Sequence, residues 1–169
     1  MCSPRSPQRP DALAALGAAA VRVAEESFFA FAEPSDLARV AALLQARPGA
    51  EPWLLAAVGF TGPFEGVVQV ALPHALAGEL AGAFCGVPAE TLDDAHITDF
   101  AGELANMVCG SWLTQTHRTE RFALAAPSVT VADHAAASAA AADPTALGVV
   151  LNETPVLLTL VVNSFAAEA

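Results

Sequence analysis

The stretch WLLAAVGFTGPFEGVVQVAL, residues 53–72, contains two short apolar runs separated by a turn. WLLAAVGF (53–60) and GVVQVAL (66–72) have the length and apolar content of half-buried or buried strands. The connecting TGPFE contains Gly and Pro, residues that favour a reversal of the chain. The stretch therefore predicts a β-hairpin, and the flanking segments decide what covers it.

Helical patterns flank the hairpin on both sides. Apolar periodicity and the Asp, Pro and Gly residues at segment ends predict four helices: Asp11 (a candidate N-cap) to about Phe31, Pro34 through Leu44, Pro73 to about Cys85, and roughly 93–116. RPGAEP (47–52) is predicted to be a loop, and the Pro-rich start MCSPRSPQRP (1–10) a disordered leader. Residues 11–169 are then expected to form one domain.

Further strands are predicted after the long helix. One lies around 121–132, and two more, 146–153 and 155–162, are separated by a tight turn at Asn152–Thr154. The alanine tract 135–142 has the composition to extend as a helix, but Pro144 and its place between strands favour a mobile connection. This order predicts an α+β domain with a mostly antiparallel sheet covered by helices.

Composition restricts the function further. Hydrophobic residues make up 54% of the 169 residues and charged residues 15%, which is typical of a folded body. The net charge of −11, with no lysine, argues against nucleic-acid binding and favours a partner with a cationic patch. Three cysteines without a CxxC pair indicate a reducing compartment. No apolar run approaches the roughly 18 residues that span a bilayer, so a cytoplasmic protein is expected.

Polar residues in the long helix need a separate explanation. In DFAGELANMVCGSW (99–112), with Asp99 at 0° and about 100° per residue, Glu103 falls near 40°, Asn106 near −20° and Gly110 near 20°. The bulky apolar residues lie on the opposite arc, so the helix is predicted to be amphipathic with a narrow polar stripe.

The stripe has a structural and a chemical interpretation. In the first, Asp99 caps or charge-complements an early helical turn, Glu103 is an ordinary surface residue and Asn106 is incidental. In the second, the Glu103/Asn106 pair presents a carboxylate and a carboxamide from one helical turn. A carboxamide holds a water molecule in a fixed orientation without taking its proton, and phosphoryl transfer depends on such positioning. Spacing alone leaves both interpretations open.

DFAGELANMVCG resembles the signature of the CheC/CheX/FliY chemotaxis phosphatases: Asp or Ser, three residues, Glu, two residues, Asn, and a following glycine. The resemblance is closest to the CheX-like branch and covers about residues 20–163. It includes FEGVVQVALP, ALAGELAGAFCG and the later stretch ending in APSVTVAD. It implies a CheC/CheX-like fold and a homodimer that pairs through its sheets, for which the strand at 155–162 is a candidate edge.

The resemblance also implies an activity, dephosphorylation of a CheY-like response-regulator receiver in chemotaxis or related two-component signalling. Asn106 would then position the attacking water at the phospho-aspartate, and Glu103 would pair with the receiver's active-site lysine. Asp99 and Gly110 have supporting positions. The chain would need no metal or cofactor of its own, since Mg²⁺ would belong to the receiver.

A non-catalytic module that binds a receiver or another signalling protein is the alternative. Some relatives carry a second Glu/Asn motif on the first helix, where VAEESFFAF has Phe28 or Phe29 in place of the Asn. The first helix is therefore expected to serve packing. SWLTQTHR (111–118) also lacks the lysine that many relatives have after the glycine.

Other chemistry-bearing residues favour structural interpretations. The histidines His74, His96, His117 and His134 show no metal-ligand spacing and are expected at the surface. Cys109 is expected to be a buried, inert thiol. Ser111 lacks the GxSxG context of a nucleophilic serine.

Overall fold

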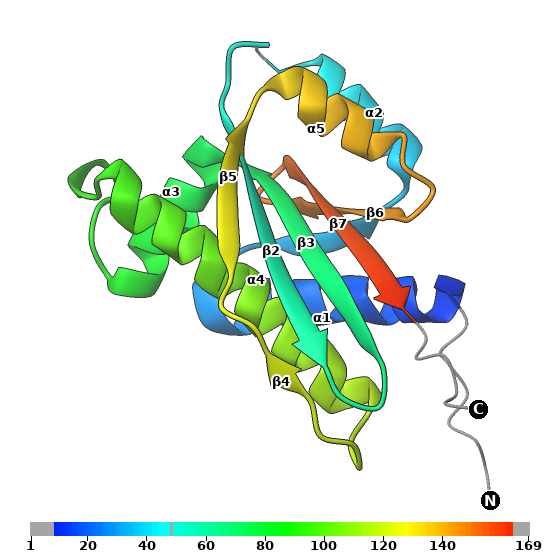
Figure 1. The fold of residues 1–169 in the computed structure, drawn as a ribbon. Helices are drawn as coiled ribbons and strands as arrows, with labels where there is room; N and C mark the ends of the chain where they lie inside the picture. The colour runs from blue at the N-terminus through cyan, green and yellow to red at the C-terminus, as the bar shows by residue number, and fades with distance from the viewer. Residues whose placement is uncertain (1–8, 48, 164–169) are drawn as a thin grey trace, which may run out of the picture.

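The computed structural model describes residues 9–47 and 49–163 (Figure 1). In chain order the elements are α1 (Arg9–Phe28), β1 (Ala32–Ser35), α2 (Leu37–Gln45), β2 (Trp53–Thr61), β3 (Glu65–Pro73), α3 (His74–Cys85), the 3-10 turn η1 (Ala89–Thr91), α4 (Asp94–Thr116), β4 (Ala123–Leu124), β5 (Ser128–Ala132), α5 (His134–Ala141), β6 (Ala146–Leu151) and β7 (Thr154–Asn163).

The strands form one seven-stranded sheet in the order β1-β6-β7-β3-β2-β4, with β5 also pairing β2. Every pairing is antiparallel. The predicted hairpin is β2–β3, with register from Trp53 opposite Pro73 to Phe60 opposite Gly66. The predicted α+β class with an antiparallel sheet and covering helices is confirmed.

Strand alternation gives the sheet two apolar faces. In β2, Leu54, Ala56 and Val58 belong to the main core, whereas Trp53 belongs to a second cluster. Because successive residues of a strand point to opposite faces, the two clusters lie on opposite sides of the sheet. Helices α1, α3 and α4 contribute to the main core, and α2 and α5 to the second cluster (Figure 1). The site-bearing helix α4 thus lies in the α1/α3/α4 layer.

Side chains and glycine fix the helix ends. Asp36, Asp93 and Asp133 each accept a hydrogen bond from the backbone N–H three residues later, at 2.7, 2.9 and 2.8 Å. These are N-caps of α2, α4 and α5. Gly86, at φ 69°, ends α3 in the left-handed conformation, which costs glycine little.

The first helix and its continuation differ from the prediction. Helix α1 begins at Arg9, so Asp11 lies in its first turn and is not the N-cap, and it ends at Phe28 rather than near Phe31. Residues 1–8 of the predicted leader lie outside the described residues. Beyond the helix, β1 pairs with β6 instead of forming part of a helix. Only pairing with a strand more than a hundred residues later makes this segment extended, so the local pattern did not reveal it.

Three other predictions were wrong. The tract 135–142 is mostly helix α5, capped by Asp133 and anchored by buried Ala137, rather than a mobile connection. The strand expected around 121–132 is divided into β4 and β5, which pair with opposite ends of β2. Strand β7, expected as a free edge, lies between β6 and β3. Its pairing with β6 over Thr154–Thr159 and with β3 over Leu157–Asn163 makes it an interior strand of the sheet rather than an edge.

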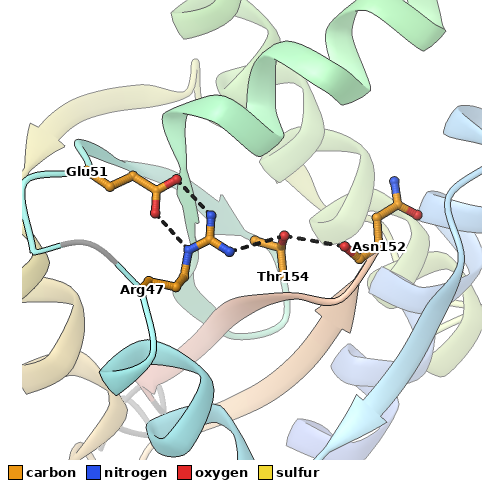
Figure 2. A network of polar contacts seen from close by, with 4 residues as sticks. All are labelled: Arg47, Glu51, Asn152 and Thr154. Carbon is orange, nitrogen blue, oxygen red and sulfur yellow. Dashed lines mark hydrogen bonds and ion pairs between the residues drawn. The ribbon is translucent and has the colours of Figure 1, made fainter.

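A polar network holds the loop after α2 against the β6–β7 turn (Figure 2). Arg47 donates to both carboxylate oxygens of Glu51, at 2.7 and 2.8 Å, and to Thr154 Oγ1 at 3.4 Å. The Thr154 hydroxyl donates to the Asn152 carbonyl at 3.4 Å. Bidentate arginine–carboxylate geometry is the strong form of an ion pair, so Arg47 joins Glu51 firmly to the start of β7.

Candidate functional site

Helix α4 is 23 residues long and packs against other parts of the chain on two sides. Phe100 meets the ring of Phe28 from α1, with centroids 5.1 Å apart. On the other side, a Cβ at Gly102 would lie 3.2 Å from Pro127 Cγ, so the glycine lets the β4–β5 segment lie against the helix. These contacts fix the rotation of α4 about its axis.

The fixed rotation exposes the predicted stripe. Asp99 and Glu103 are exposed, and Asn106 and Gly110 are partly exposed. The interleaved residues Phe100, Leu104 and Val108 are buried. The structure therefore brings all four predicted positions to one face of one helix, as the helical geometry predicts.

The polar groups of the stripe are unpaired. Within the described part of the chain, Asp99, Glu103 and Asn106 have no hydrogen-bond or ion-pair partner. Side chains three or four positions apart on a helix are close enough to pair, but in the described ranges these three do not pair with one another or with a neighbour. Two carboxylates and one carboxamide are thus available to an incoming molecule.

Two hollows flank the stripe. One, of about 330 Å³, lies beside Asp99 and Glu103 and is walled by Phe84, Leu92 and Phe100. The other, of about 410 Å³, begins at Gly110 and continues along the segment after α4, where Arg118 and Arg121 line it. The wall of the first hollow was not predictable from the sequence, because Phe84 and Leu92 come from separate elements and share no spacing with the motif.

The cysteines differ in environment. Cys109 is fully buried, and burial raises the pKa of its thiol to about 12. It is therefore a protonated core residue, as expected, rather than a nucleophile. Cys85 is exposed at the end of α3.

The histidines are mostly paired with carboxylates. His74 and His96 lie 3.2 and 2.6 Å from Asp94 and Asp93 respectively. The backbone N–H and then the ring of His96 lower the pKa of Asp93. His117 is not a surface residue as predicted, because its ring packs against Phe64, with centroids 4.9 Å apart. Among residues 9–47 and 49–163, no group of three His, Cys, Asp or Glu side chains is arranged to hold a metal ion.

The first helix contributes packing rather than a second polar pair. Glu25 and Glu26 are exposed near its end. Phe28 is buried against Phe84 and Phe100, with centroids 5.6 and 5.1 Å away. Phe29 lies beyond the last helical residue. The expectation that this helix serves packing agrees with the contacts of Phe28.

One protein-family model matches the sequence. The family model for the chemotaxis phosphatase CheX matches residues 54–147, more than half of the chain, and this range includes α4 and its stripe. No curated protein matches the sequence. None of the described helices is long and apolar enough to cross a membrane.

Solved structures share the fold at low sequence identity. The chemotaxis protein CheX from Vibrio vulnificus is 16% identical with a TM-score of 0.66, over 94% of this chain and 100% of that one. CheX from Desulfovibrio desulfuricans is 17% identical with a TM-score of 0.61, over 90% and 99%. CheX from Borrelia burgdorferi, solved with CheY, BeF₃ and Mg²⁺, is 12% identical with a TM-score of 0.57, over 92% and 98%.

Proposed function

This chain belongs to the CheX family of chemotaxis phosphatases, and we propose that it accelerates hydrolysis of the phospho-aspartate of a CheY-like response-regulator receiver. The observation that carries the proposal is the unpaired Glu103/Asn106 pair on the exposed face of α4. The Borrelia burgdorferi relative, solved with CheY and the phosphoryl mimic BeF₃, supports a receiver as the partner.

Asn106 supplies orientation. The oxygen of a water molecule attacks phosphorus, and the bond from phosphorus to the aspartyl oxygen breaks. The products are inorganic phosphate and the free aspartate carboxylate. The carboxamide oxygen of Asn106 accepts a hydrogen bond from this water and holds it in line with the breaking bond. Because an amide takes no proton at neutral pH, the water's proton leaves with the phosphate. A loose transition state needs positioning more than covalent help.

Glu103 supplies recognition. Its unpaired carboxylate forms an ion pair with the lysine of the receiver's active site, which sets the register of α4 over the phosphoryl group. Asp99, one turn earlier, adds negative charge on the same side, and Gly110 leaves room for close approach. The Mg²⁺ that neutralises the phosphoryl oxygens belongs to the receiver. The protein is expected to work in the cytoplasm, together with its receiver.

We also propose that the protein forms a homodimer. With β7 in the interior of the sheet, pairing would use another surface. Val67 and Val161 lie side by side on β3 and β7 and are exposed, on the sheet face that α2 and α5 cover elsewhere. Light scattering after gel filtration tests the state: a mass near twice 17.2 kDa supports the dimer, and a mass near 17.2 kDa contradicts it.

Phosphate release tests the function. CheY-like receivers from the source organism are phosphorylated with Mg²⁺ present and mixed with wild-type protein, Asn106→Ala or the control Asn163→Ala. Asn163 is exposed on β7, away from α4. Acceleration by wild type and control, lost in Asn106→Ala, is expected. Binding of the beryllofluoride-activated receiver should survive in Asn106→Ala. A receiver that binds wild type without faster hydrolysis would indicate the non-catalytic module instead.

A further inference from the structure

The hollow beside Glu103 has no part in the chemistry described above. We propose that it is an anchoring pocket for one apolar side chain of the receiver, next to the lysine that pairs with Glu103. The inference rests on the proposed function for the identity of the partner.

The walls of the hollow are preformed. Phe84 is 52% exposed and forms one wall. Its ring is held edge-on by Phe28, with centroids 5.6 Å apart, and at a tilt by Phe100, at 6.2 Å. An aromatic side chain locked by two others loses little freedom when a partner covers it. Aromatic side chains, Phe included, are enriched in protein interfaces, and a preordered one costs less entropy to bind.

The size favours a side chain over a free small molecule. About 330 Å³ is at the lower end of the roughly 300–1,000 Å³ of small-molecule pockets. Those sites also have a small number of polar groups that converge on the ligand and fix its orientation. Here the charged and imidazole groups all come from α4, whereas α3 and the segment before α4 contribute Phe84 and Leu92. The hollow therefore fits an apolar group that enters from a surface lying across α4.

The rim specifies the partner's charge. Asp99 and Glu103 line the hollow and have no partner within the described part of the chain. A complementary surface carries an apolar side chain with a cationic group beside it. A second copy of this chain, with net charge −11 and no lysine, is a poor match. Anionic lipid surfaces would be repelled by the same carboxylates.

Filling the hollow tests the inference. Cys85 is exposed and lines the hollow, so Cys85→Phe places a ring in it without disturbing the core. The control Ala83→Phe adds the same ring at an exposed position of α3 that does not line the hollow. Each variant is titrated with the beryllofluoride-activated receiver and assayed for phosphate release. Thermal melting confirms that each variant is folded.

Cys85→Phe is expected to weaken receiver binding about tenfold or more and to raise KM to match, with kcat unchanged. The Ala83→Phe control should stay within about twofold of wild type. Unchanged binding by Cys85→Phe, with normal hydrolysis by wild type, overturns the pocket and leaves the function standing. Weakened binding by Cys85→Phe, with no hydrolysis by wild type, supports the pocket and overturns the function. Self-association lost in Cys85→Phe, with receiver binding intact, assigns the hollow to a second copy and overturns the inference.

Discussion

Replacing Gly110 with alanine should stabilise the fold and impair the proposed reaction. Gly110 lies inside α4, and the nearest atom to an added Cβ would be Leu124 Cδ1 at 3.8 Å, an ordinary van der Waals contact. A helical glycine costs about 0.8–1.0 kcal/mol relative to alanine, so Gly110→Ala should raise the free energy of unfolding by about that amount. For a domain of this size, the melting temperature should rise by about 2–4 °C.

The same methyl group lies on the exposed stripe. Gly110 is one turn beyond Asn106, so the Cβ points toward the surface that the receiver would cover. A displacement of about 1 Å at a reacting centre can cost about a hundredfold in rate, so kcat/KM should fall at least about tenfold. Ala14→Gly, at an exposed position within α1, calibrates the helix effect with an expected loss of about 0.8–1.0 kcal/mol.

Denaturant unfolding and phosphate release together decide the outcome for Gly110→Ala. A more stable variant with undiminished hydrolysis would refute the idea that a receiver approaches over Gly110. A destabilised variant would show that the helix has less room at this position than the 3.8 Å contact indicates. Receiver binding by Ala14→Gly, a variant altered in helix stability outside α4, shows how much binding responds to a change in stability alone.

Two further substitutions test the fold. Phe29 has φ 54° and is 85% exposed. Phe29→Gly should relieve left-handed strain of about 1–2 kcal/mol, and the greater freedom of glycine in the unfolded chain offsets part of this gain. The melting temperature should rise, and a lower melting temperature would contradict this reasoning. Because burial raises the pKa of Cys109 from 9.0 to about 12, the unfolded thiol loses its proton first, and stability should fall as pH rises above 9. This fall should be shallower in Cys109→Ala, and equal slopes in the two proteins would count against the assignment.

The sequence predicted elements whose signal is local. The hairpin at 53–72, the α3 stop at Gly86 and the amphipathic α4 all follow from periodicity and end residues. Helical geometry also placed Asp99, Glu103, Asn106 and Gly110 on one face, because a single long helix carries them all.

Features that depend on distant partners were not predictable in this way. Strand β1 exists because β6 pairs with it, and Asn152 fixes the approach by accepting a hydrogen bond from the Phe31 N–H at 2.9 Å. The alanine tract of α5 is held by an Asp133 cap and by Ala137 packing into the second cluster. The hollow beside Glu103 combines Phe84 and Leu92 from separate segments, and only the folded chain brings them together.

Paramagnetic broadening tests most directly whether α4 faces the receiver's reaction centre. The ¹⁵N-labelled protein is mixed with a beryllofluoride-activated receiver that carries Mn²⁺ in place of Mg²⁺. If Asn106 lies at the phosphoryl group, its side-chain amide signal and the backbone signals around Glu103 should disappear first, while those of α5 keep their intensity. Broadening centred on any other surface, with the Asn106 signal intact in a saturated complex, would contradict the account.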